Sequence, residues 1–185
     1  MELLNEPIPG VLELQARAFN DSRGSFSETF SRRTMAGFGV DLEFCQDNES
    51  YSAVRGTVRG LHLQAEPHAQ GKLVRVLRGS IFDIAVDVRP ESPTFRSHAS
   101  VELTEGDHRA FWIPPGFAHG FCTLADDTVV SYKVTDFYAP ETERSIRFDD
   151  ADLGIDWPVA AEDAVLSDKD AAAPSFATFL EEMTR

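Results

Sequence analysis

Short runs of β-branched and aromatic residues, separated by glycine, proline and aspartate, recur along most of the chain. Residues 74–88 show the pattern most clearly, as two apolar strands that meet at Arg78-Gly79-Ser80. In the second strand the odd-numbered residues 81–87 share one face and the even-numbered residues 82–88 share the other. Further strands are predicted at residues 97–103, 110–113, 120–124 and 128–135. Strands of this length, with turns about every 8–12 residues, are typical of β-sandwiches and barrels.

Turn and helix signals complete the predicted architecture. Pro114-Pro115-Gly116 must form a turn, because neither proline can donate to a sheet ladder. Helical patterns are few and short, at residues 31–37 and 175–183, and Ser175 is the expected N-cap of the second. We therefore predict a mainly β chain with short peripheral helices, organised as one domain over residues 1–185.

The net charge bears on the possible binding partners, and the two cysteines bear on the cellular compartment. The formal net charge of -14 argues against nucleic-acid binding, which depends on neutralisation of phosphates by lysine and arginine. No apolar run approaches the roughly 20 residues of a membrane helix, and the acidic start lacks the pattern of a secretion signal. Cys45 and Cys122 have no metal-like spacing, so we expect two buried, unpaired thiols in a cytoplasmic protein.

Residues 59–64 (RGLHLQ) place polar side chains in an apolar strand. On a strand, His62 and Gln64 point to one face and the two leucines to the other. Arg59 has the wrong parity to share the face of His62, unless Gly60 introduces a bulge. Taken alone, a histidine in this setting is more often a hydrogen-bonded core residue than a catalyst.

Three further polar residues stand in apolar strand patterns. Lys72 opens a strand, where lysines are usually edge charges or reach out to water. His119 follows the proline turn among small and aromatic residues, where a ligand could reach it. Tyr132 shares a face with Val130 and Val134, so its ring is predicted to be buried and its hydroxyl to need a partner.

A metal site is the main chemical alternative for these histidines. Metal-binding cupins often use two histidines and a glutamate from one strand motif and a third histidine from a PxGxxH segment. Residues 114–119 fit the second motif, but the first offers only His62, with His68 six residues further on. Transition metals usually require three or four protein ligands, so we predict no metal.

Eight segments, taken in order, resemble the motifs of the dTDP-4-dehydrorhamnose 3,5-epimerase family, a metal-free branch of the cupin superfamily. They are DSRGSFSETF (21–30), CQDNESYS (45–52), RGTVRGLHLQ (55–64), QGKLVRVLRGSIFDIAVDVR (70–89), SPTF (92–95), WIPPGFAHGF (112–121), SYKVTDFYAPETE (131–143) and LSDKD (166–170). The resemblance implies a cupin-type double-stranded β-helix, or jelly-roll barrel. The chain departs from the family at Leu63 and Phe137, where tyrosines are usual, and at Arg96, where glycine is usual.

The resemblance also implies roles for individual residues. His62 would be the catalytic base, Asp170 its orienting partner and Tyr132 the acid on the opposite face of the sugar. Lys72 would lie near the substrate ketone. Substrate binding is implied for Arg23, Phe26, Glu28, Gln46, Asn48, Arg59, His119, Tyr138, Glu143 and Lys169, with Tyr138 stacked on thymine.

Family members are homodimers in which an N-terminal segment crosses to the partner. We therefore expect residues 1–30, which carry Arg23, Phe26 and Glu28, to serve the neighbouring site. Residues 171–185 are expected to form a C-terminal tail beyond the last motif.

The implied chemistry explains why these residue types are needed. Inversion of a carbon next to a ketone requires a base, a group that stabilises the enolate oxyanion, and an acid on the other face. Histidine has a pKa near working pH, a carboxylate fixes its tautomer, and a lysine can meet the developing charge. No redox step occurs, so no cofactor is expected, in agreement with the absence of a GxGxxG fingerprint.

The predicted function is epimerisation at C3, C5 or both of a dTDP-4-keto-6-deoxyhexose, in rhamnose or antibiotic-sugar biosynthesis. A 4-keto-sugar nucleotide isomerase or dehydratase on the same barrel would keep the nucleotide-binding residues but move the acid and the base. A non-catalytic sugar-binding cupin would lack one of the two. The presence of both His62 and Tyr132 favours the epimerase. The sequence leaves open which centres invert, which pathway takes the product, how strictly thymine is required, and whether Lys72 is cationic.

Overall fold

The computed structural model describes residues 1–183 and is mainly β. Its strands are β1 (Glu2–Ile8), β2 (Val11–Gln15), β3 (Ala18–Asp21), β4 (Gly24–Ser27), β5 (Gln46–Ser52), β6 (Val58–Gln64), β7 (Lys72–Arg78), β8 (Ser80–Asp87), β9 (His98–Thr104), β10 (Arg109–Ile113), β11 (Phe117–Thr123), β12 (Thr128–Val134) and β13 (Glu143–Ser145). Its helices are α1 (Arg32–Gly37), the 3-10 turn η1 (Ala161–Asp163), α2 (Asp168–Ala171) and α3 (Phe176–Met183).

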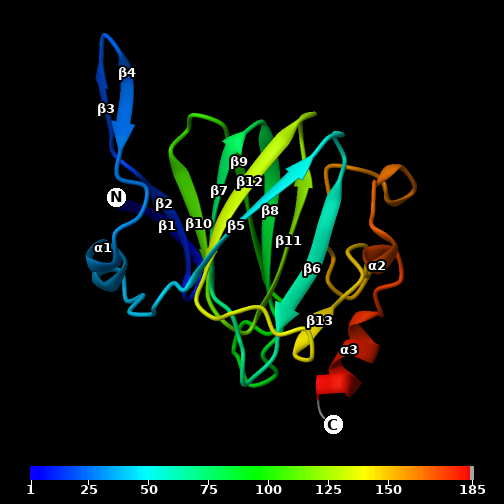
Figure 1. Cartoon of the computed structure of the whole chain (residues 1–185). Helices are drawn as coiled ribbons and strands as arrows, with labels where there is room; N and C mark the ends of the chain where they lie inside the picture. The colour runs from blue at the N-terminus through cyan, green and yellow to red at the C-terminus, as the bar shows by residue number, and fades with distance from the viewer. Residues whose placement is uncertain (184–185) are drawn as a thin grey trace.

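Two antiparallel sheets lie face to face (Figure 1). One has six strands in the order β1-β2-β10-β7-β12-β5, and the other has five in the order β13-β6-β11-β8-β9. The consecutive strands β7 and β8 belong to different sheets, so the chain crosses between them at Gly79. Gly79 has a φ of 78°, and a Cβ there would lie 2.4 Å from the Thr128 hydroxyl, so this crossing favours glycine. The prediction of a cupin-type jelly roll with short peripheral helices is confirmed.

The main core fills the space between the two sheets. Strand alternation decides which side chains enter it: on β8, Ile81 and Ala85 face the main core, whereas Ile84 and Val86 pack on the outer side. Phe176 and Phe179 of α3 cover that outer side, and α1 covers the outer side of the six-stranded sheet through Met35 and other residues. Both sheets are thus covered outside while their inner faces enclose a cavity.

A two-stranded arm projects from the barrel. Its strands β3 and β4 pair only with each other, and Figure 1 shows the arm extending beyond the six-stranded sheet. The arm leaves Phe19 and Phe26 exposed by 54% and 71%. By contrast, β1 and β2 lie in the sheet of their own chain, so only part of residues 1–30 stands free of the barrel.

The predicted strands and helices are confirmed, with ends shifted by a few residues. Ser175 caps α3 as expected, because its Oγ accepts a hydrogen bond from the Thr178 amide. The C-terminal tail is not loose, since α3 packs on the sheet, and residues 184 and 185 lie outside the described residues.

The prediction of two buried thiols was wrong for Cys45. Cys122 is buried on β11, but Cys45, which directly precedes the edge strand β5, is exposed. Among residues 1–183, no helix has the length and apolar character required to cross a membrane.

Candidate active site

Two adjoining cavities open between the inner faces of the sheets and share the side chains of His62, Lys72 and Tyr132. The first, of about 350 Å³, is also lined by Gln46, Asn48, Leu63, Gln64, Gln70, Tyr138 and Glu143. The second, of about 270 Å³, is also lined by Ser50, Arg59, His119, Phe121, Ser167, Lys169 and Asp170. Together they have the size of a small-molecule site and bring together most of the residues predicted from the sequence.

A bulge at Gly60 brings Arg59 into the cavity beside His62. In the pairing of β6 with β11, His62 lies opposite His119 and Arg59 lies opposite Phe121, so β6 carries one extra residue between them. Gly60 has a φ of 129°, and a Cβ there would lie 2.6 Å from the Gly120 Cα. The bulge predicted at this glycine is confirmed, and no side chain could replace its hydrogen without moving the backbone.

His62 and Asp170 form a tight pair at the edge of the second cavity. The His62 Nε2 lies 2.5 Å from Asp170 Oδ1, and the Ser167 hydroxyl donates to Asp170 Oδ2 at 2.8 Å. Burial opposes ionisation of Asp170, but the hydrogen bonds from His62 and Ser167 outweigh it and hold the carboxyl pKa below its usual value. The ionised carboxylate therefore takes the Nε2–H of His62 and leaves Nδ1 as the basic nitrogen of the ring.

A second histidine–aspartate pair lies deeper in the barrel. His119 Nε2 is 2.6 Å from Asp83 Oδ1, and both side chains are buried. Burial lowers the pKa of His119, although the Asp83 charge opposes that shift. A neutral His119 that donates its Nε2–H to Asp83 leaves Nδ1 as an acceptor, which can take a hydrogen bond from a ligand without adding charge.

Tyr132 enters the cavity from the sheet opposite His62. Its ring packs against the main core beside Val130, as its strand parity predicted. Its hydroxyl has no hydrogen-bond partner among the described residues and lines both cavities, so it is free to meet a ligand. Burial raises the pKa of Tyr132, and the charge of Arg59 counteracts this only partly, so the hydroxyl is protonated at neutral pH.

Lys72 lies in the interior of the six-stranded sheet rather than at its edge. It opens β7 between β10 and β12, and its Nζ lies 3.4 Å from the backbone oxygen of His62. Burial lowers the pKa of Lys72 to about 8, while the charges of Asp83 and Glu143 act against the shift. At neutral pH the amine is therefore mostly a cation. It lies close to His62, which the family resemblance implied to act at the reacting carbon.

Polar side chains surround these interior groups and are here called the rim: Gln46, Asn48, Arg59, Tyr138, Glu143 and Lys169. Glu143 accepts a hydrogen bond from Tyr138 at 3.0 Å and pairs with Lys169 at 2.5 Å. Burial favours the protonated form of Glu143, but the bonds from Lys169 and Tyr138 hold its pKa below the usual value. Gln46 donates to Asn48 on β5, directly beside Tyr132 in the sheet.

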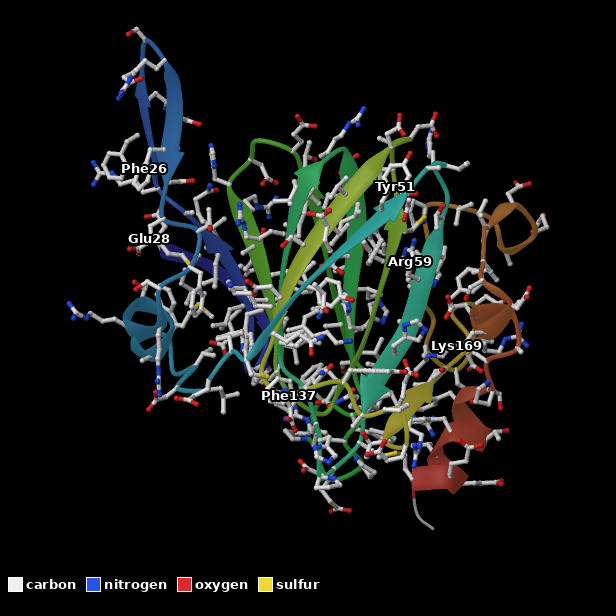
Figure 2. The ribbon with its side chains drawn as sticks, viewed as in Figure 1. Phe26, Glu28, Tyr51, Arg59, Phe137 and Lys169 are labelled. Carbon is white, nitrogen blue, oxygen red and sulfur yellow. The ribbon has the colours of Figure 1, made fainter. Side chains whose placement is uncertain are left out.

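Arg59 completes the cationic side of the rim. It donates to the Ser52 hydroxyl at 3.1 Å and to the Tyr51 carbonyl at 2.8 Å, so its guanidinium is held against β5. Figure 2 shows Arg59 and Lys169 on the same side of the barrel. Lys169 is paired with Glu143, whereas Arg59 is held by a hydroxyl and a carbonyl, so the charge of Arg59 is available to a ligand in a chain of net charge -14.

Three predicted binding residues do not reach the cavity of their own chain. Arg23 and Phe26 lie on the arm and Glu28 follows it, and Figure 2 shows Phe26 and Glu28 across the molecule from Arg59 and Lys169. Arg23 forms an exposed ion pair with Asp21 instead. The arm pairs with no other strand, so within one chain these side chains have no route to His62.

Some residues at the site were not singled out from the sequence. Parity placed Asp83 on the same face as Ile81 and Ala85, and a carboxylate among them is the signal that could have marked it as the partner of His119. Ser167 could have been found as the first residue of a helix cap three positions before Asp170. Gln64 was placed on the face of His62 by parity but given no role, and Gln70 lines the first cavity without a sequence signal of its own.

The two histidines of the cavities, His62 and His119, are each paired with an aspartate and do not form a cluster with one another. Within residues 1–183, no group of three or more histidine, cysteine, aspartate and glutamate side chains is arranged to hold a metal ion. The groups present are instead an imidazole paired with a carboxylate, a protonated phenol and a buried cation. This set is suited to moving protons next to a carbonyl.

Known proteins resemble the chain along nearly its whole length. A family model described as dTDP-4-dehydrorhamnose 3,5-epimerase matches residues 5–178. A dTDP-4-dehydrorhamnose 3,5-epimerase of Sinorhizobium fredii is 51% identical over 168 residues, which cover 91% of this chain and 86% of that protein.

Two solved structures extend the likeness to three dimensions. A dTDP-6-deoxy-D-glucose-3,5-epimerase from Legionella pneumophila, in complex with dTDP-4-keto-L-rhamnose, has a TM-score of 0.92 at 43% identity, covering 98% of this chain and 96% of that one. ChmJ, a 3'-monoepimerase from Streptomyces bikiniensis solved with dTDP-quinovose, has a TM-score of 0.86 at 34% identity, covering 95% and 87%. With the matching family model, these likenesses show that the chain belongs to the dTDP-4-dehydrorhamnose 3,5-epimerase family.

Proposed function

We propose that this protein epimerises a dTDP-linked 4-keto-6-deoxyhexose at C3, C5 or both, by removing and returning a proton next to the ketone. One observation carries the proposal: His62 and Tyr132 enter the same cavities from opposite sheets. A sugar ring held between them presents one face to a base and the other to an acid. Inversion of a carbon centre requires this arrangement, because a proton returned to the original face restores the substrate.

His62 is the proposed base. Its Nδ1 takes the proton from carbon, and the ring becomes an imidazolium that the ionised Asp170 stabilises through Nε2. Ser167 holds the second carboxylate oxygen, so the orientation of the imidazole is fixed before substrate arrives. Positioned acid–base groups of this kind contribute roughly 10²–10⁴-fold to rate.

Lys72 is the proposed stabiliser of the enolate oxygen. With a pKa lowered by burial to about 8, its ammonium is present at neutral pH and needs no reorganisation when charge develops on the ketone oxygen. Tyr132 then delivers its proton to the opposite face of the carbon. The raised pKa of this buried phenol keeps the proton in place until an enolate is available.

The rim is the proposed binding site of the nucleoside diphosphate. Arg59 and Lys169 offer the positive charge that a diphosphate needs, and they overcome the unfavourable field of a chain with net charge -14. The exposed ring of Tyr138, at the edge of the first cavity, is available to stack on thymine. Gln46, Asn48, His119 and Glu143 are the proposed polar contacts to sugar and nucleotide.

A homodimer is proposed to complete the site. The arm exposes Phe26 and holds Arg23 in an exposed ion pair with Asp21, an arrangement that gains apolar burial only when a partner receives it. In the proposed dimer, Arg23, Phe26 and Glu28 reach the neighbouring cavity and add a further cation for the diphosphate. Exchange of an element between two identical chains is a common route to a symmetric dimer.

The cytoplasm is the proposed location. The thiol of Cys45 is exposed and unpaired, and such thiols persist in reducing compartments. The proposed chemistry uses no metal, no cofactor, no nucleic acid and no membrane.

The experiment is incubation with dTDP-4-keto-6-deoxyglucose in D₂O, followed by NMR of the product. Deuterium at both C3 and C5 with inversion is expected for a double epimerase. Deuterium and inversion at one carbon only would place the protein with single-centre enzymes such as ChmJ. A product with a moved ketone or a lost hydroxyl would support the isomerase or dehydratase instead, and substrate recovered without deuterium would contradict the proposal.

A further inference from the structure

Gln64 ends the strand that carries His62, and the residue is almost completely buried at 4% exposure. Its Nε2 donates to the His68 carbonyl at 2.7 Å and to the Phe137 carbonyl at 3.1 Å. Its Oε1 accepts the Ala139 amide at 2.9 Å. Both amide hydrogens are therefore used within the protein, and Gln64 has no donor left for a substrate.

The two loop groups that Gln64 holds lie on either side of Tyr138. Phe137 and Ala139 belong to the segment between β12 and β13, and Figure 2 shows Phe137 at the lower end of the barrel. Other side chains hold the start of the same segment, since Gln70 donates to the Asp136 carbonyl at 2.7 Å. The backbone around Tyr138 is thus fixed by the amides of Gln64 and Gln70, together with Asp136, which accepts the Phe137 amide, and Thr142, which donates to the Ala139 carbonyl.

Tyr138 itself has little else to hold its ring. The residue is 57% exposed, and among residues 1–183 no aromatic ring or cation stacks on it. Its one side-chain hydrogen bond runs from the hydroxyl to Glu143, which pairs directly with Gln64 in the register of β13 and β6. The direction of the ring therefore depends on the backbone that Gln64 clamps and on the hydroxyl contact.

We infer that Gln64 is a positioning residue, which holds the segment around Tyr138 so that the ring is ready to stack on the base of a nucleoside diphosphate. This inference rests on the proposed function, because it takes Tyr138 as the base-binding side chain. A pre-placed ring binds more tightly because less side-chain and loop entropy is lost on binding. Gln64 acts on nucleotide affinity and leaves the proton transfers at His62 and Tyr132 unchanged.

A double-mutant cycle separates this role from a merely structural one. The variants are Gln64→Leu, Tyr138→Ala and both together, and calorimetric titration with dTDP gives each affinity. Because stacking on an aromatic ring contributes substantially to binding of a base, Gln64→Leu is expected to weaken dTDP binding about tenfold when Tyr138 is present. In the Tyr138→Ala background the same change is expected to cost about twofold or less, since the group it acts through is gone.

Thr128→Val is the matched control. The buried Thr128 also donates from its side chain to a loop carbonyl, that of Ala125, but it lies outside both cavities. It is expected to lower thermal stability without changing dTDP affinity. In steady-state assays, Gln64→Leu is expected to raise KM while kcat stays within about threefold, as for loss of binding that substrate and transition state share.

Gln64→Glu provides a second variant if Gln64→Leu does not fold. It keeps an acceptor for the Ala139 amide but turns a carboxyl oxygen toward the His68 and Phe137 carbonyls, so a weakening in the same direction is expected. Equal weakening with and without Tyr138, or no weakening in folded variants, would overturn the inference alone. Failure of both variants to fold where Thr128→Val folds would assign Gln64 a structural role and also overturn it. Wild-type protein that binds no dTDP would contradict the proposed function itself.

Discussion

His62 and Asp170 lie 108 residues apart in the sequence, yet His62 Nε2 and Asp170 Oδ1 are 2.5 Å apart in the fold. The strand β6 supplies the imidazole and the one-turn helix α2, capped by Ser167, supplies the carboxylate. This contact decides which ring nitrogen carries a proton. It leaves Nδ1 as the nitrogen that can accept one, and the proposed mechanism depends on that choice.

Replacing Asp170 by asparagine tests the contact directly. An amide can donate to the imidazole as well as accept from it, so the tautomer is no longer fixed and the imidazolium loses its counter-charge. We expect kcat to fall by about 10²–10⁴-fold with the fold intact. Asp168→Asn, an exposed carboxylate on the same helix, should leave kcat unchanged. An Asp170→Asn enzyme within a few-fold of wild type would remove Asp170 from the mechanism.

The lowered pKa of Lys72 predicts an alkaline limit to activity. Below a pKa of about 8 the amine is charged and can stabilise the enolate oxygen, and above it the amine is neutral and cannot. The value of kcat/KM should therefore fall as pH rises through about 8, and Lys72→Met should be slow at all pH values. Lys72→Arg keeps a charge to much higher pH, so any activity it retains should lack this alkaline limb. An unchanged limb in the arginine variant would assign it to another group.

The proposed exchange of the arm predicts complementation between two inactive variants. Arg23→Ala damages the arm, and His62→Ala damages the barrel. In a mixed dimer one site combines a sound arm with a sound barrel, so mixing and refolding the two proteins should restore up to about a quarter of wild-type activity. Each variant mixed with itself serves as the control. A fully active monomer in light scattering, or no recovery from proven mixed dimers, would contradict the composite site.

The proposed mechanism also predicts that activity does not depend on a metal. The two cavity histidines are each engaged by an aspartate, His62 by Asp170 and His119 by Asp83. Prolonged dialysis against a chelator should therefore leave kcat unchanged, with elemental analysis as the independent check. Stoichiometric metal, together with activity that is lost on chelation and regained on re-addition, would show this prediction to be wrong.

The strand framework could be predicted from the sequence because alternation and turn residues are local signals. On β8 the odd and even positions separate onto the two faces as expected, and Gly79 marks the crossing between sheets. Sheet order could not be predicted in the same way. The neighbours β10, β7 and β12 are far apart in the sequence, and only long-range packing brings them together.

The residues of the candidate site divide in the same way, into those that local sequence patterns could predict and those that they could not. Parity placed Tyr132 on the inner face, and the glycine suggested the bulge that turns Arg59 inward. The partnership of His62 with Asp170 came only from resemblance to a family, because no local pattern connects a strand to a helix so distant in the chain. Asp83 and Gln64 were missed as functional residues, since their partners are set by tertiary contacts.

Tyr132→Phe tests the assignment of acid and base to opposite faces. The substitution keeps the ring packing, Lys72 and His62, so proton abstraction can continue while delivery to the opposite face is lost. Tyr51→Phe is the matched control, because its hydroxyl bonds Asp127 and lines neither cavity. It should leave both exchange and inversion unchanged. His62→Ala should abolish exchange and inversion together.

The most direct measurement is the ratio of deuterium exchange to inversion for Tyr132→Phe in D₂O with dTDP-4-keto-6-deoxyglucose. Inversion is expected to fall by about 10²–10⁴-fold, the usual contribution of one acid–base group. Exchange at the carbons next to the ketone is expected to fall much less, as the proton on His62 trades with solvent, so the ratio should rise well above that of wild type. Inversion within a few-fold of wild type in Tyr132→Phe, or exchange that persists in His62→Ala, would contradict the two-sided mechanism.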